Sequence, residues 1–175
     1  MNEIIKKNGV TFGIILGLFS VLFTTAIYVT DLQLFTSWWI GLASFAIAIA
    51  IGVVLVSKTK KQMGTMTFKE GFTVYFIAAL IGSFISQLYN YILFNFIDVQ
   101  AKETIKEITM KYTSDMLEKF GTPAAAINDT MQKMAETDNY SIGNILFGLA
   151  IALVFQAIFG LILAAIFKSK SNQGL

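Results

Sequence analysis

The sequence of 175 residues contains no cysteine, no histidine and no arginine, and it has one proline. Without cysteine there is no thiolate nucleophile, no disulfide and no sulfur ligand for a metal. Without histidine there is no imidazole base and no histidine metal site. The chain also lacks a glycine-rich phosphate loop with its lysine. We therefore expect a protein that is not an enzyme and that holds no cofactor or metal.

Charge is also scarce, because only 14% of the residues are charged while 55% are hydrophobic. Four long stretches contain no charged side chain: 8–30, 32–57, 71–97 and 139–167. Each exceeds the roughly 20 apolar residues that a helix needs to cross a bilayer. The sequence predicts one all-α domain over 1–175, an integral membrane four-helix bundle. The expected membrane helices cover about 9–30, 33–57, 68–97 and 141–167.

The lysines predict the orientation of these helices. They flank the first membrane helix, the loop after the second, and the end of the fourth: Lys6, Lys7, Lys58, Lys60, Lys61, Lys69, Lys168 and Lys170. Segment 98–138 instead has five lysines against eight acids, a net charge of −3. Because basic residues near membrane helices stay in the cytoplasm, we expect both termini inside and 98–138 outside. The aromatic residues expected at the outer interface are Tyr28, Trp38, Trp39 and Tyr140.

Two further expectations concern partners. Lys58, Lys60 and Lys61 set the topology, contact anionic lipid head groups, or do both. The net charge of +2 is small and the lysines are dispersed, so we expect no nucleic-acid partner.

Small residues recur about one turn apart in every expected membrane helix. The glycines among them are Gly9, Gly13, Gly17, Gly52, Gly82, Gly148 and Gly160. Such residues allow close approach of helix backbones in lipid. They pack the helices of one bundle together, or the stripe of the first helix forms a homo-oligomer contact; the pattern is compatible with both.

Polar residues inside a membrane are costly and are therefore candidates for function. On the third helix Ser83, Ser86, Gln87 and Asn90 share one face, and Gln156 lies near the middle of the fourth. These side chains either hydrogen-bond helices together or line a path for a solute. The absence of an aqueous cavity beside them would weaken the interpretation as a path.

Local signals define the ends of several helices. Thr67 and Glu70 form the pattern of a capping box at the start of the third membrane helix. In segment 98–138, apolar residues at helical spacing predict helices over 102–120 and 123–136. Gly121, Thr122 and Pro123 are expected as the C′ residue of one helix, the N-cap of the next and its first residue. Acid–lysine pairs four residues apart are expected to support this helical hairpin: Asp98–Lys102, Glu107–Lys111, Asp115–Lys119 and Asp129–Lys133.

The order of these parts resembles the domain-of-unknown-function family 4199. The segments that carry the resemblance are Met66–Phe72, Tyr89–Tyr91, Phe94–Asp98, Met116–Gly121 and Ala165–Lys168. The resemblance spans nearly the whole chain and implies a small four-span protein of the Bacteroidetes inner membrane, with segment 98–138 in the periplasm. Members often have proline after the Ile–Asp pair; here Val99 follows, so we expect the third helix to continue outward without a sharp turn.

From these features we expect a non-catalytic structural or interaction component of the bacterial envelope. Its partners would be the bilayer and a periplasmic or membrane protein that contacts 98–138. The alternative is a small transporter or channel with a polar path through the third and fourth membrane helices.

Overall fold

The structure is a computed structural model and describes residues 2–169. In chain order its elements are α1 (Glu3–Thr30), the 3-10 turn η1 (Leu32–Thr36), α2 (Trp38–Met63), α3 (Phe68–Ile92), the π-helical turn η2 (Leu93–Ile97), α4 (Val99–Lys119), α5 (Ala124–Glu136) and α6 (Ile142–Phe167). Four helices are long and apolar enough to cross a membrane: α1, α2, α3 with η2, and α6. The all-α expectation is confirmed, and each expected membrane helix overlaps one of these four.

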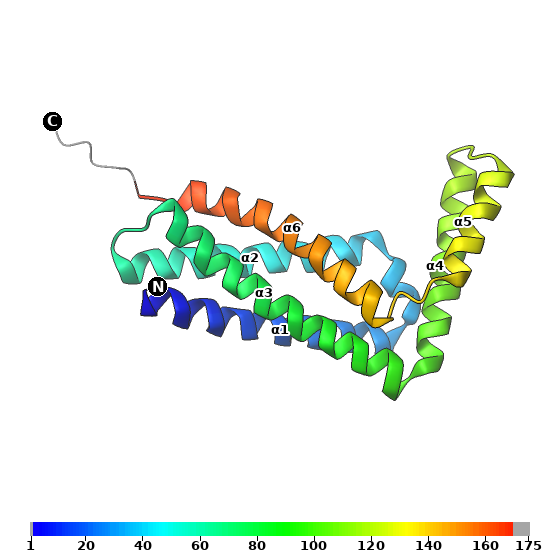
Figure 1. Ribbon diagram of the computed structural model, residues 1–175, viewed down its shortest axis with the longest axis horizontal. Helices are drawn as coiled ribbons and strands as arrows, with labels where there is room; N and C mark the ends of the chain where they lie inside the picture. Colours follow the sequence, from blue (N-terminus) through cyan, green and yellow to red (C-terminus); the bar gives the residue numbers. More distant parts are fainter. Residues whose placement is uncertain (1, 170–175) are drawn as a thin grey trace.

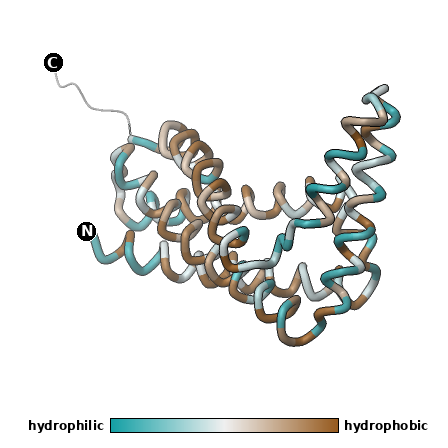
Figure 2. The backbone as a smooth tube through the Cα atoms, turned by 45° about the vertical axis from the view of Figure 1, so that its right-hand side comes forward, coloured by the Kyte–Doolittle hydropathy of each residue, from teal (hydrophilic) through white to brown (hydrophobic). Residues whose placement is uncertain are grey.

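The four long helices lie side by side, and α4 and α5 form a hairpin across one end of the bundle (Figure 1). We call this end the hairpin end. The opposite end, which holds the start of α1, the turn between α2 and α3 and the end of α6, is the terminal end. Hydrophobic residues dominate the middle of the bundle (Figure 2). Many large apolar side chains also face outward there, as in a bundle surrounded by lipid.

Two membrane helices begin at places other than those expected. α1 begins at Glu3 rather than near residue 9, because the Asn2 side chain caps it by accepting from the Ile4 N–H at 2.8 Å. α2 begins at Trp38 rather than near 33. Asp31 caps the preceding η1 turn by accepting from the Gln33 N–H at 2.8 Å. Each shift follows from a side-chain oxygen that satisfies a free backbone donor.

The expected capping box at the start of α3 is confirmed. The Thr67 hydroxyl accepts from the Glu70 N–H at 3.3 Å, and the Glu70 carboxylate accepts from the Thr67 N–H at 2.8 Å. Such a reciprocal pair satisfies two backbone donors that the first turn of a helix leaves free.

The expectation that the third helix continues outward is wrong. The chain turns at Asp98, whose backbone leaves the helical region at φ −141° and ψ 84°. Asp98 then caps α4 by accepting from the Ala101 N–H at 2.9 Å, so α4 begins at Val99 rather than at 102. The Tyr28 hydroxyl donates to the same carboxylate at 2.8 Å. A capping carboxylate and a partner on α1 thus make the corner without proline.

The turn between α4 and α5 has a Schellman geometry. Gly121 adopts a φ of +73°, its N–H donates to the Glu118 carbonyl at 2.9 Å, and the Thr122 N–H donates to the Leu117 carbonyl at 3.0 Å. Gly121 is therefore the C′ residue, as expected. The expected N-cap is wrong by one residue: Pro123 precedes the first helical residue, and Thr122 completes the preceding turn instead.

Packing is unequal along the bundle. In α2 and α6 every buried residue lies in the half nearest the terminal end, and in α1 and α3 most of them do, the exceptions being Gly17, Ile27 and Gly82. The main cluster is centred on Leu55, Val56, Val74 and Ala78. A second buried cluster, which includes Leu93 and Phe94 of η2, lies at the hairpin end. The bundle is therefore closed at the terminal end and most loosely packed between the two clusters.

The end of α6 is tied to the turn before α3. The Ser169 N–H donates to the Met66 carbonyl at 2.8 Å, and the Met66 N–H donates to the Ser169 hydroxyl at 3.0 Å. Met66 is itself buried in the main cluster. Lys170, which was used to predict the topology, lies outside the described residues.

Candidate functional site

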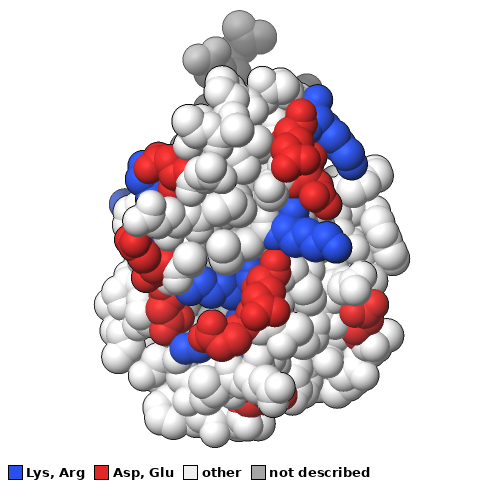
Figure 3. Space-filling model, turned by 90° about the vertical axis from the view of Figure 1, so that its right-hand side faces the viewer, with Lys and Arg blue, Asp and Glu red and all other residues white. Residues whose placement is uncertain are grey.

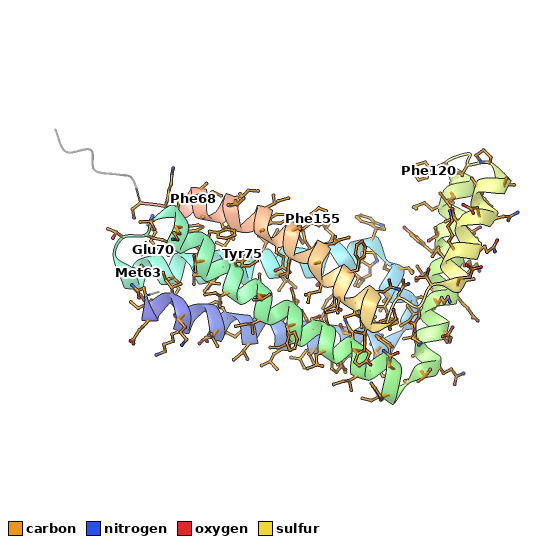
Figure 4. The ribbon with its side chains drawn as sticks, in the orientation of Figure 1. Met63, Phe68, Glu70, Tyr75, Phe120 and Phe155 are labelled. Atoms are coloured by element: carbon orange, nitrogen blue, oxygen red, sulfur yellow. The ribbon has the colours of Figure 1, made fainter. Side chains whose placement is uncertain are left out.

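A cavity lies between the four long helices, next to the tightly packed half and on the side of it that faces the hairpin end. Its volume is about 320 Å³. All four long helices contribute to its wall: Leu16 and Ser20 of α1, Phe45, Ala48 and Ile49 of α2, six residues of α3 between Tyr75 and Gln87, and four residues of α6 between Ala152 and Phe159. Figure 4 labels two of the lining residues, Tyr75 on α3 and Phe155 on α6. Because pockets for small ligands start at about 300 Å³, the cavity is large enough to hold one.

Four of the five candidate polar residues line this cavity: Ser83, Ser86, Gln87 and Gln156. Gln156 donates from its amide nitrogen to the Ser83 hydroxyl at 2.7 Å, which joins α6 to α3. Ser86 and Gln87 make no such bond within the described residues. One pair therefore binds helices together, while two polar side chains remain available to a solute.

Asn90 is separate from this group. It does not belong to the cavity wall, and its side-chain oxygen Oδ1 is buried without a hydrogen-bond partner in the described residues. A buried acceptor without a partner costs stability. The sequence face that Asn90 shares with Gln87 therefore does not place both residues at the same site.

Small residues bring α1 against α3. A Cβ added to Gly9, Gly13 or Gly17 would lie 2.7–2.8 Å from Ile77, Ile81 or Ile85, respectively. The glycine stripe of α1 thus faces α3 of the same chain, in a register that advances four residues at each step. Gly52 and Gly160 are similarly close to Tyr75, and Gly82 is close to Leu16. Gly148 differs, because nothing lies within 4 Å of the place where its Cβ would be.

Sequence reasoning missed the polar contacts of α1. The Asn8 amide donates to the Thr59 hydroxyl at 3.0 Å and to the Gln62 side-chain oxygen at 2.7 Å, and both Asn8 and Thr59 are buried. The spacing of Thr59 and Gln62 places them on one face of α2, which is the only signal the sequence offers. These bonds fix α2 to α1 at the terminal end.

Lys58, Lys60 and Lys61 lie near the end of α2, next in sequence to Thr59 and Gln62. The Lys58 ammonium lies over the ring of Phe12, 5.5 Å from its centroid. Lys60 and Lys61 occupy the last turn of α2, where positive charge is favourable near the free carbonyls. Their contact with lipid head groups stays a prediction.

Ionic and polar contacts fasten the hairpin to the bundle. Lys102 binds Asp138 at 3.1 Å rather than Asp98, which corrects one expected pair. Of the four pairs expected along the sequence, the described residues form only Asp129–Lys133, at 2.7 Å. The Asn95 amide donates to the Tyr140 carbonyl at 3.0 Å.

The carboxylates at this junction are stabilised in their charged form. The Ala101 N–H, followed by the Tyr28 hydroxyl, lowers the pKa of Asp98. Burial would raise the pKa of Asp138, but the bonds from the Tyr140 N–H and Lys102 outweigh it, so that pKa is also lowered. Burial and the nearby Asp138 raise the pKa of Tyr140 to about 12. At neutral pH the junction therefore holds two carboxylates and a neutral phenol.

The cavity offers amides, hydroxyls and aromatic rings but no carboxylate or ammonium group. Among residues 2–169 there is no group of three or more acidic side chains that could hold a metal ion. Such a wall can hydrogen-bond an uncharged molecule and contact its apolar parts.

Comparison with known proteins gives one family match. The family model described as a protein of unknown function, DUF4199, matches residues 11–169. No curated protein matches the chain. No solved structure matches it either. The matched region includes most of α1, the whole of the other three long helices, the cavity and the hairpin, and the chain therefore belongs to the DUF4199 family.

Proposed function

We propose that this chain is a multi-pass protein of the bacterial inner membrane whose central cavity takes up an uncharged solute. The observation that carries the proposal is the 320 Å³ cavity, whose wall holds polar groups without a hydrogen-bond partner among the described residues. A polar group in lipid is expensive unless it has a partner. Ser86 and Gln87 are such groups, and a bound solute or water would satisfy them.

The orientation in this proposal places both termini in the cytoplasm and the hairpin in the periplasm. Lys6, Lys7, Lys58, Lys60 and Lys61 are all at the terminal end, whereas the hairpin segment is net acidic. The positive-inside rule supports this orientation. The inner membrane is supported by helical membrane segments, since outer-membrane proteins of bacteria are typically closed barrels.

The chemistry of the wall defines the class of solute. Two glutamines and three serines supply donors and acceptors, and Phe45, Phe155 and Phe159 supply apolar contact. The wall has no charged group, so a charged solute would lose the free energy of its hydration without an opposite charge to compensate for it. We therefore propose a small neutral molecule with hydroxyl or amide groups, and a binding or transport role rather than a catalytic one.

Gln87→Leu tests the proposal, because it removes a polar wall group without breaking an interhelical hydrogen bond. We expect proteoliposomes with this variant to lose uptake of neutral solutes, measured as osmotic swelling with a panel of polyols and small amides, while the unfolding transition stays unchanged. The matched control is Asn90→Leu, one turn along α3 and outside the cavity wall. Equal uptake by the wild type, Gln87→Leu and protein-free liposomes would contradict the proposal.

A second candidate function is an interaction component of the envelope that acts through the hairpin. The charged side chains on the face of the hairpin that points away from the bundle support it (Figure 3). Deleting residues 100–136 should then abolish co-purification of an envelope protein while membrane insertion remains intact. An unchanged set of co-purified proteins would contradict this candidate.

A further inference from the structure

Helix α4 has one apolar face, and only its first half is covered. Ala101 and Ile105 are buried against the end of the bundle, in a cluster with Leu93 and Phe94. Further along the same face come Tyr112, Met116 and Phe120, which are 43%, 39% and 80% exposed. Steps of four residues keep these side chains on one side of the helix. We call Tyr112, Met116 and Phe120 the free edge of α4.

The direction of the free edge follows from the first half of the helix. α4 runs across the hairpin end, and its second half extends past the side of the bundle (Figure 1). Ala101 and Ile105 pack on the end of the bundle. The free edge lies further along the same face of α4, beyond the side of the bundle, and therefore faces the lipid that surrounds the bundle. Phe120 at the tip points to that side (Figure 4).

The opposite side of α4 is charged. Glu103, Glu107 and Glu118 are all exposed, and by helical spacing they lie away from the free edge. The view from the hairpin end shows acidic and basic side chains gathered on this outward face (Figure 3). A helix with an apolar side toward the bundle's surroundings and a charged side away from them has the pattern of a helix that lies in a membrane interface.

We propose that the free edge of α4 is inserted into the boundary between head groups and acyl chains of the bilayer that the four long helices cross. The position of the free edge along the bundle axis supports contact with lipid. Exposed Trp38 and Trp39 start α2 at the same end of the bundle, where such rings mark the interface. At the α3–α4 corner Phe96 and Ile97 are also exposed, so apolar side chains flank α4 at both of its ends.

Apolar burial, not attraction to anionic lipid, holds the edge in place. Segment 98–138 carries five lysines and eight acids, so an anionic surface would repel it. The inference is independent of the solute proposed for the cavity and of which side of the membrane the hairpin occupies. It requires only that the four long helices cross a bilayer.

The absence of cysteine makes the test direct, because one introduced cysteine is the only labelling site. We would attach a polarity-sensitive fluorophore to Phe120→Cys and Met116→Cys, with Glu118→Cys and Glu107→Cys as matched controls on the charged side. In phosphatidylcholine proteoliposomes, labels at 116 and 120 should emit at shorter wavelength than the controls. Lipid nitroxides near the glycerol backbone should quench them, and anionic lipid should not strengthen the effect.

Two results would overturn the inference. One is water-like emission at both 116 and 120, equal to that at 107 and 118. The other is apolar emission that resists quenching by lipid nitroxides and disappears when the protein is diluted in lipid, because that result assigns the edge to a second copy of the chain. If Phe120→Cys fails to fold, as judged by circular dichroism, Met116→Cys reports on the same edge.

Discussion

Replacing Gly13 with alanine tests the close approach of α1 to α3. The new Cβ would lie 2.7 Å from the Ile81 Cβ and 3.1 Å from the Ala78 carbonyl oxygen. Neither atom is the end of a flexible side chain, so the helices must separate. Overpacking of this kind costs about 1–3 kcal/mol, and the better helix propensity of alanine returns up to about 1 kcal/mol. We expect a net loss of about 1–2 kcal/mol in the free energy of unfolding.

Gly148→Ala is the matched control, because it makes the same chemical change in a long helix with nothing within 4 Å. It should leave stability unchanged or raise it by up to about 1 kcal/mol. Both variants would be unfolded reversibly with sodium dodecyl sulfate in mixed micelles and followed by circular dichroism. If Gly13→Ala is as stable as Gly148→Ala, the packing argument is refuted. If Gly13→Ala instead lowers the oligomer mass without destabilising the monomer, the stripe is an oligomer contact.

Four further predictions concern polar contacts and turns. Asn8→Ala should cost about 1–2 kcal/mol in the same assay because it removes two interhelical bonds at the terminal end, whereas Asn90→Leu should be neutral or stabilising because it removes a buried acceptor without a partner. Gly121→Ala should cost about 1–2 kcal/mol locally because φ is +73°, and faster amide exchange confined to α4 and α5 would report it. The pKa of Asp98 is lowered in the folded protein, so its charged form stabilises the α4 corner above the ordinary carboxyl pKa of 3.8, and this stabilisation is lost as the pH falls through the lower folded pKa. The rate of amide exchange at Ala101, measured as a function of pH, tests this. Asp98→Asn should remove the pH dependence while keeping the cap.

The features that the sequence predicts well are local. The Thr67–Glu70 box and the Gly121 turn depend on residues within a few positions of one another, and the structure contains both. Lack of charge over more than 20 residues likewise marks each long helix. The α3–α4 corner shows the limit of local signals. A continuous helix was expected there because proline is missing, but Asp98 makes the turn by capping α4, and its carboxylate also binds Tyr28 of α1, which is far away in the sequence.

Which side chains meet between helices was not predictable. Lys102 has Asp98 at the favourable helical spacing, yet Asp98 is occupied as a cap and Lys102 pairs with Asp138, 36 residues away. Ser83, Ser86 and Gln87 of the polar face of α3 line the cavity while Asn90 does not, and the sequence gives no signal for this difference. Small residues occur in all four helices, so composition alone did not reveal where the bundle would stay open.

The bonds between Met66 and Ser169 have a consequence for biosynthesis, because their partners are 103 positions apart. At translation rates of about 5–20 residues per second, the α2–α3 turn emerges roughly 5–20 s before its partner. During that interval α6 is not yet made, so the α3 surface around Gly71 and Tyr75 that later receives it faces lipid or the insertion machinery. Closure of the bundle therefore waits for the synthesis of α6, and nascent chains arrested before residue 142 should be preferred substrates of membrane quality-control proteases.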